Sequence, residues 1–164
     1  ISNYYSTELT QQASQILRNL GTPCLIHQPR YNIMDRQIEN GLLQTLQSGG
    51  IGCIAFSVLN QGILSDKYLG QIPEGSRIAK AHTPMEADRL TDQLLHKVSQ
   101  LNDIALARGQ SLAQMALAWV LRNESVTTAL CGASRPEQIE DSVKVLSNLD
   151  FSSEELERID HIVT

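Results

Sequence analysis

The sequence predicts an α/β protein built on a parallel β-sheet. Short apolar runs rich in β-branched residues recur along the 164-residue chain, and each is followed by apolar residues at helical spacing. The runs are continuous rather than alternating, which is typical of strands whose two faces are both covered. The repeated order of strand and helix therefore predicts parallel β/α units with helices packed on the sheet.

Helix starts in this chain carry recognisable capping residues. Ser6 suits an N-cap, and capping boxes are expected at Ser111 with Gln114, Ser134 with Glu137, and Ser152 with Glu155. In chain order, the expected elements are a strand end at residues 1–5, a helix after Ser6 that Gly21 ends, a strand at 24–28, a helix at 37–47, a strand at 51–56, a helix from Met85 to about Arg108, a helix after Ser111, a strand at 127–131, a helix after Ser134, and a final helix from Ser152 through Ile159.

Composition excludes several classes of protein. A net charge of −5 argues against a general nucleic-acid binder. No apolar run approaches the ~20 residues of a membrane span, and we expect no secretory leader. The 3 cysteines lie in apolar runs without metal-ligand spacing, so we expect buried thiols, no metal site and a reducing, cytoplasmic location.

The turn after residues 127–131 resembles a phosphate-binding element. Gly132 and Ala133 carry almost no side chain, Ser134 follows as a predicted helix cap, and Pro136 suits the first helical turn. A helix N-terminus offers unpaired N–H groups and partial positive charge to an anion. An ordinary strand-to-helix turn with a capping serine remains the alternative.

Polar residues gather where the predicted strands end. In parallel β/α folds these carboxyl ends carry the functional residues. No GxGxxG follows any strand, which weakens a dinucleotide-binding doubly wound sheet, and part of a (β/α)8 barrel is the competing architecture. The residues at these ends describe a surface that binds a polar ligand and stacks a ring: Ser2, Asn3, His27, Gln28, Tyr31, Asn32, Phe56, Ser57, Asn60, Gly132 and Ser134.

Four motifs together resemble the aldo-keto reductase superfamily. They are ISNY at residues 1–4, HQPRYN at 27–32, AFSVLNQGILSDKY at 55–68 and GASRPEQ at 132–138. Their order and spacing extend the resemblance over the whole chain. The branch they resemble most contains the bacterial L-glyceraldehyde-3-phosphate reductases and the potassium-channel β-subunits. The resemblance implies a (β/α)8 TIM barrel that binds NADP(H) and transfers hydride to aldehydes.

The same resemblance implies which part of the barrel is present. The four motifs belong to the fifth to eighth strands, so residues 1–164 would form the C-terminal, cofactor-binding half. The catalytic Asp, Tyr, Lys and His of the family lie on the first four strands, and this sequence has no counterpart of them. His27 is not that histidine, because it precedes the glutamine of the sixth strand. We therefore expect the chain alone to be inactive, with no catalytic residue of its own.

Cofactor-binding residues follow from the resemblance position by position. Ser2, Asn3 and Gln28 would bind the nicotinamide carboxamide, and Phe56 would stack on the ring where relatives have Tyr or Trp. The pyrophosphate would follow Ser57, Leu59, Asn60 and Lys67, with Ser76 and Arg77 folding over the cofactor; the adenosine end and its 2′-phosphate would contact Gly132, Ser134, Arg135, Gln138, Asp141 and Ser142.

Single residues in this set have simpler interpretations. Phe56 ends an apolar run and suits a core, while Lys67 and Arg77 suit a solvated loop. Two positions also depart from the family pattern, namely Val58 in place of Pro and Ser142 in place of Asn. These departures concern details of the cofactor site rather than the family.

The predicted function is NADP-dependent reduction of small aldehydes, of the L-glyceraldehyde-3-phosphate or methylglyoxal kind. The alternative is a cofactor-sensing regulatory subunit of the channel β-subunit type with little turnover. The expected partner is a small carbonyl substrate, without nucleic acid or membrane, and self-association into a homo-oligomer is left open.

Overall fold

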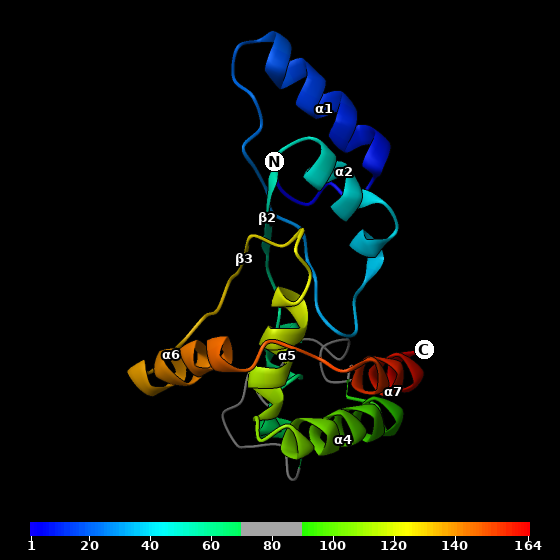
Figure 1. Ribbon diagram of the computed structural model, residues 1–164, viewed down its shortest axis with the longest axis vertical. Coiled ribbons are helices and arrows are strands. Elements are labelled where there is room, and N and C mark those ends of the chain that lie inside the picture. The colour runs from blue at the N-terminus through cyan, green and yellow to red at the C-terminus, as the bar shows by residue number, and fades with distance from the viewer. Residues whose placement is uncertain (70–89) are drawn as a thin grey trace.

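Three short parallel strands lie side by side in chain order at the centre of the protein (Figure 1). A computed structural model describes residues 1–69 and 90–164, and the structural statements below concern those residues. The strands are β1 (Ile26–His27), β2 (Gly52–Ala55) and β3 (Thr128–Ala129). Residues 1–3 run alongside β1, where Ser2 forms a parallel bridge with Gln28. The parallel α/β prediction is confirmed.

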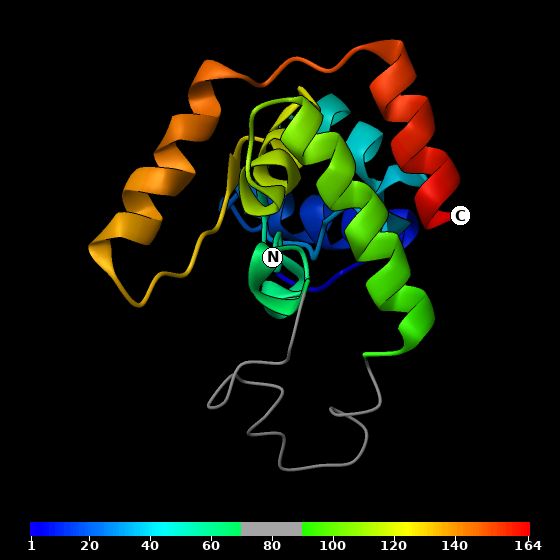
Figure 2. The ribbon, with the colours of Figure 1, turned by 90° about the horizontal axis from the view of Figure 1, so that it is seen from below.

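Helices connect and cover these strands (Figures 1 and 2). Contacts join α2 to β2 and α5 to β3, while α4 packs against both α5 and α7. The α-helices are α1 (Thr7–Asn19), α2 (Leu42–Ser48), α4 (Asp92–Ala107), α5 (Leu112–Leu121), α6 (Pro136–Val143) and α7 (Ser153–Val163); the short 3-10 helices are η1 (Gln37–Glu39), η2 (Asn60–Gly62), η3 (Asp66–Tyr68) and η4 (Lys144–Ser147).

Three of the predicted helix caps are confirmed. The Ser6 hydroxyl accepts a hydrogen bond from the backbone N–H of Leu9 at 3.2 Å. Both halves of a capping box are present at Ser111 and again at Ser152. Each cap satisfies N–H groups that the helix itself leaves unpaired, and such a cap typically stabilises a helix by ~1 kcal/mol.

The predicted helix over residues 37–47 is divided into two pieces. The 3-10 helix η1 ends before Gly41, and α2 starts after it. Gly41 adopts a φ of +99°, a left-handed conformation that no α-helix contains and that glycine adopts readily. Ile38 before this break and Leu42 after it are both buried. The sequence therefore predicted correctly which residues face the core, although it did not predict the break.

The predicted helix from Met85 to about Arg108 corresponds to α4, which begins at Asp92. Thr91 is the N-cap of α4, and its hydroxyl accepts from the Leu94 N–H at 3.1 Å. Residues 85–89 lie outside the described ranges. At the other end of the chain, α7 continues past the predicted Ile159 to Val163.

The core lies between one face of the sheet and the helices. Neighbouring residues of a strand point to opposite faces, and in β2 Cys53 and Ala55 are fully buried while Ile54 is half-buried. The core extends through α5 to the ring of Trp119, whose centroid is 5.2 Å from that of Tyr31. Burying each large apolar side chain here contributes roughly 1.5–3 kcal/mol.

The expectation of three buried thiols holds for only one cysteine. Cys53 is buried, Cys24 is half-buried and Cys131 is exposed. Residues 127–131 were predicted as a buried strand, yet Leu130 is 46% exposed. The reason is that β3 is the last strand of the described sheet, so no neighbour covers its outer side.

Candidate functional site

Ser2, Asn3 and Gln28 come together at the carboxyl end of the first two sheet segments. The Asn3 N–H donates to the carbonyl oxygen of Gln28 at 3.1 Å, and the Gln28 N–H donates to the carbonyl of Ile1 at 2.9 Å. The Ser2 hydroxyl lies 3.4 Å from the side-chain oxygen of Gln28. The structure thus places three predicted cofactor residues side by side; their binding role stays a prediction.

Phe56 continues the sheet beyond the end of β2. It forms a parallel bridge with Arg30, whose guanidinium carbon lies 5.9 Å from the centroid of the Phe56 ring. The ring is half-buried, so it is neither sealed in the core nor fully exposed. Such a ring leaves an aromatic surface on which a flat ligand can stack.

The segment after Phe56 is held by a buried side chain. The Asn32 side-chain NH2 donates to the carbonyl oxygen of Ser57 at 3.0 Å, and Asn32 is fully buried. Leu59 packs against the core, and its carbonyl accepts hydrogen bonds from two later N–H groups. Lys67 is exposed in η3. The predicted residues Ser76 and Arg77 lie outside the described ranges.

Strained backbone is concentrated at these strand ends. Four non-glycine residues among those described have positive φ: Asn3 (60°), Ser57 (54°), Asn60 (45°) and Gln61 (59°). Three of them are predicted cofactor residues and the fourth is adjacent. Left-handed backbone at a non-glycine residue costs of order 1–3 kcal/mol, and it is typically concentrated where a binding site requires it.

The segment after β3 starts from the same edge of the sheet. The Leu130 N–H donates to the carbonyl of Ala55 at 2.8 Å, which places the ends of β2 and β3 next to each other. All residues from 130 to 140 are exposed, among them the predicted Gly132 and Arg135. An anion could therefore reach this segment from solvent.

The predicted capping box at Ser134 and Glu137 is wrong. Arg135 is the N-cap of α6 and makes no side-chain capping bond. The backbone N–H and the hydroxyl of Ser134 instead approach the side-chain oxygen of Gln138, at 2.8 and 3.2 Å. Pro136 explains the shift, because its preference for the first helical position makes Arg135 the N-cap, one residue later than predicted.

Asp141 and Ser142 already have protein partners. The Gln114 side-chain NH2 donates to an Asp141 carboxylate oxygen at 2.8 Å, which ties α6 to α5. The Ser142 hydroxyl donates to the carbonyl of Gln138 at 2.7 Å. The first bond joins α6, which buries none of its own residues, to α5, and the second lies within α6. Both side chains keep spare acceptor capacity for a ligand.

Three residues expected at the ligand surface lie in the interior. Asn32 is fully buried, and its side chain donates to the carbonyl of Ser57. Tyr31 is buried and donates to Glu39 at 2.6 Å, and burial together with this bond raises the pKa of Tyr31 well above its ordinary value. His27 is fully buried, and its burial lowers its pKa although a contact with the Tyr4 backbone acts in the opposite direction. None of the three is placed to serve as a proton donor to a ligand.

Two residues near the site were missed from the sequence. Arg30 lies over Phe56, and the Tyr5 hydroxyl contacts Asn3. Tyr5 lies two residues after Asn3, but the left-handed backbone of Asn3 breaks the alternation of an extended segment. Spacing therefore gave no signal for this contact, which depends on the geometry of the two side chains.

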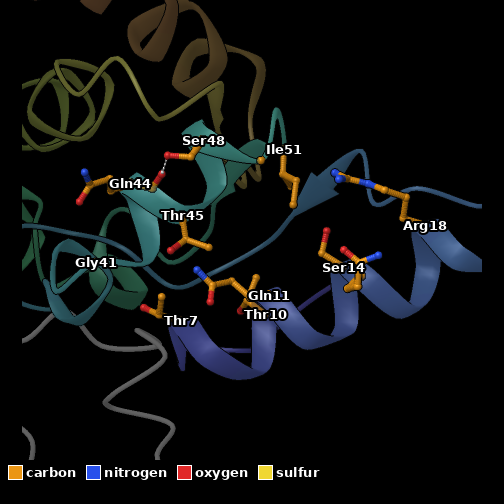
Figure 3. Close-up of a pocket in the computed structure, with 12 residues that line it drawn as sticks. Thr7, Thr10, Gln11, Ser14, Arg18, Gly41, Gln44, Thr45, Ser48 and Ile51 are labelled. Atoms are coloured by element: carbon orange, nitrogen blue, oxygen red, sulfur yellow. Dashed lines mark hydrogen bonds between the residues drawn. The ribbon is translucent and has the colours of Figure 1, made fainter.

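A polar pocket of about 520 Å³ lies elsewhere, between α1 and α2 (Figure 3). Thr7, Ser14 and Arg18 of α1 face Thr45 of α2 across it, and Ser48 also lines it while its hydroxyl donates to the carbonyl of Gln44. It contains none of the predicted cofactor residues. No helix within the described residues is long and apolar enough to cross a membrane.

The fold and the grouped strand ends agree with the comparison to known families. The model of the aldo/keto reductase family matches residues 1–164, and the chain belongs to that family, whose fold is a (β/α)8 barrel. The chain is 49% identical over 160 residues to L-glyceraldehyde 3-phosphate reductase of Escherichia coli O157:H7, covering 95% of this chain and 46% of that protein. It is 40% identical over 141 residues to a putative voltage-gated potassium channel subunit beta of Schizosaccharomyces pombe, covering 83% and 41%. The chain thus spans about half the length of the curated relatives it matches.

Proposed function

We propose that residues 1–164 form the half of a (β/α)8 barrel that contains strands five to eight and binds NADP(H). The proposal rests on family membership and on the order of the strands. Residues 1–3, β1, β2 and β3 pair in chain order without reversal. A barrel keeps this order, whereas a doubly wound sheet reverses it at its switch point.

Exposed apolar residues lie on α1 and on α6. On α1, Leu9, Ile16 and Leu20 are 52%, 60% and 71% exposed. Ile139 and Val143 of α6 are 57% and 58% exposed, and α6 lies on the opposite side of the molecule from α7 (Figures 1 and 2). Exposed apolar faces of this kind mark a surface that another segment covers. The first four β/α units of a barrel would cover both.

The arrangement of Asn3, Ser57 and Asn60 is the observation that carries the cofactor assignment. Their strained backbone conformations coincide with the positions that the family resemblance assigned to the cofactor. The donors fit a nicotinamide, because amide NH2 groups on Asn3 and Gln28 suit a carboxamide oxygen and the half-buried Phe56 ring suits its flat face. When bound, the cofactor supplies the hydride.

The complete protein is proposed to be an oxidoreductase that reduces small aldehydes, such as L-glyceraldehyde 3-phosphate or methylglyoxal, to alcohols. The E. coli relative bears the name of the first of these activities. The family resemblance places the catalytic acid on the first four strands, so we assign the proton donor to the other half of the barrel. The free thiols suit a reducing, cytoplasmic location. The proposal leaves open whether the protein forms a homo-oligomer.

Two proteins test the proposal together. One is residues 1–164 alone; the other, called the completed barrel here, fuses them behind the part of the E. coli relative that precedes the matched region. We expect the completed barrel to bind NADPH, as measured by cofactor fluorescence, and to oxidise it with glyceraldehyde. We expect residues 1–164 alone to show no turnover, because the proton donor is missing. Turnover by residues 1–164 alone, or no NADPH binding by the completed barrel, contradicts the proposal.

The alternative is a cofactor-sensing subunit with little turnover. It is favoured by the 40% identity to the S. pombe protein named as a channel subunit. The same assay separates the two functions. Tight NADPH binding without aldehyde-dependent oxidation, in the native protein that contains this chain, indicates the sensing subunit.

A further inference from the structure

The hydroxyl of Tyr5 lies between Asn3 and Arg30. Its oxygen is 3.0 Å from the side-chain oxygen Oδ1 of Asn3 and 3.3 Å from the backbone nitrogen of Arg30. A backbone N–H can only donate, so the Tyr5 oxygen accepts from Arg30. The single hydroxyl proton is then left for Asn3 Oδ1, which can only accept.

This chain of two hydrogen bonds fixes which way the Asn3 amide is turned. Its oxygen faces Tyr5, and its NH2 group points away from Tyr5. Within residues 1–69 and 90–164 that NH2 group has no hydrogen-bond partner, and Asn3 is exposed. The side-chain amide of Gln28 is turned in the same way, because its oxygen faces a protein hydroxyl, that of Ser2, at 3.4 Å.

We propose that Tyr5 is a positioning residue for the cofactor. It holds the Asn3 NH2 group toward the carboxamide oxygen of the nicotinamide, and this inference rests on the proposed cofactor function. Without the Tyr5 hydroxyl the amide can rotate by half a turn, because its oxygen and nitrogen have the same shape. It would then present an oxygen to an oxygen, and the bond to the carboxamide would be lost.

Tyr5 is itself well held for this task. Its ring is half-buried and packs against the core, so the hydroxyl is carried on a side chain with little freedom. The Arg30 N–H that fixes the hydroxyl belongs to a residue bridged to Phe56 in the sheet. Supporting contacts of this kind keep a binding group in one geometry before the ligand arrives.

Removing only the hydroxyl tests the proposal. In the completed barrel, Tyr5→Phe should weaken NADPH binding by roughly threefold to tenfold, which is the effect of losing one hydrogen bond. The matched control is Tyr4→Phe, a neighbouring tyrosine that is 45% exposed, and it should bind like the wild type. In an Asn3→Ala background Tyr5→Phe should cause no further loss, because the two residues act through one contact.

A second variant keeps the test valid if Tyr5→Phe fails to fold. Asn3→Asp retains an acceptor for Tyr5 but removes the NH2 group, so it should weaken binding at least as much as Tyr5→Phe. Wild-type affinity in Tyr5→Phe, or an equal loss in the Asn3→Ala background, overturns the positioning role while NADPH binding by the wild type still stands. Failure of the wild type to bind NADPH overturns the proposed function and this inference with it.

Discussion

The guanidinium of Arg108 forms an ion pair with the carboxylate of Glu155 at 2.9 Å, joining the end of α4 to the start of α7. Only 4% of the Arg108 side chain is exposed. The same guanidinium lies 3.7 Å from the centroid of the Phe151 ring and donates to the carbonyl of Asp150 at 2.9 Å. One arginine therefore holds the segment that leads into the last helix.

Arg108→Ala should lower the free energy of unfolding by about 1.5–3 kcal/mol, because it removes the contact with the Phe151 ring and the charge-assisted hydrogen bonds of the guanidinium. Arg158→Ala is the matched control, since Arg158 is exposed on α7 and should change stability by under about 0.5 kcal/mol. Urea denaturation of both variants measures the difference. Equal stability of the two would show that the Arg108 contacts contribute little.

Acid should weaken the same contact. Burial pushes the pKa of Glu155 upward, but hydrogen bonds from Ser152 and Arg108 outweigh it, and the net pKa lies below the ordinary value of 4.5. A group with a lowered pKa in the folded state stabilises the fold above its unfolded-state pKa, and this contribution is lost as the pH falls through the folded-state pKa. The unfolding free energy should therefore fall below about pH 4.5, and less steeply in Glu155→Gln. An identical slope in that variant would assign the acid sensitivity to other carboxylates.

The indole of Trp119 is buried with its N–H unpaired among the described residues. Trp119→Phe keeps an aromatic ring against Tyr31 and removes the unpaired donor, so it should cost clearly less stability than Trp119→Ala. Trp119→Ala leaves a cavity and should cost about 3–5 kcal/mol. Chemical denaturation of both variants gives the comparison. A phenylalanine variant as unstable as the alanine variant would mean that the indole N–H has a stabilising partner.

Local chemistry explains which elements could be predicted from the sequence. The caps at Ser6, Ser111 and Ser152 depend on a few neighbouring residues, and all three were confirmed. The cap at Ser134 was wrong because two local signals compete there. Proline prefers the first helical position, and Pro136 prevailed over the serine-to-glutamate spacing.

Long-range packing explains what the sequence did not reveal. The pattern that predicted buried strands is the same whether or not a neighbour covers the strand, so the exposure of Leu130 and Cys131 at the outer strand was not predictable. The adjacency of Ser2 to Gln28 came from the family resemblance rather than from spacing. The hydrogen bond from Tyr5 to Asn3 needed the geometry of two side chains.

Phe56 should matter more for the cofactor than for the fold. In the completed barrel, Phe56→Ala should weaken NADPH binding about tenfold or more, since stacking on an aromatic side chain contributes ~1–3 kcal/mol. The melting temperature of the Phe56→Ala variant without cofactor should fall only modestly, because the Phe56 ring is half-buried. Phe151→Ala is the matched control, which should lower stability and leave NADPH affinity unchanged. A stability loss of about 3–5 kcal/mol in Phe56→Ala would instead make Phe56 a core residue.

The segment between β3 and α6 should select NADPH over NADH. The two cofactors differ by one 2′-phosphate, so selectivity requires donors directed at that group. Ser134 already donates to Gln138, so among the described residues of this segment and the start of α6 we assign the 2′-phosphate to the exposed guanidinium of Arg135 and the NH2 group of Gln138. A guanidinium bonds a phosphate through two parallel N–H groups, and losing such a charge-assisted contact typically costs ~1.5–3 kcal/mol.

Arg135→Ala in the completed barrel should therefore weaken NADPH binding about tenfold to a hundredfold and leave NADH binding unchanged. Gln138→Ala should show the same selectivity with a smaller loss, because a neutral donor bonds phosphate less strongly than a charged one. Ser134→Ala should act mainly through Gln138, which loses its hydroxyl partner. Arg158→Ala on α7, on the opposite side of the molecule from α6, controls for the loss of one positive charge (Figure 2). Titration of each variant with both cofactors gives the dissociation constants. Equal binding of NADPH and NADH by the wild type, or equal loss of both in Arg135→Ala, would place the 2′-phosphate away from this segment.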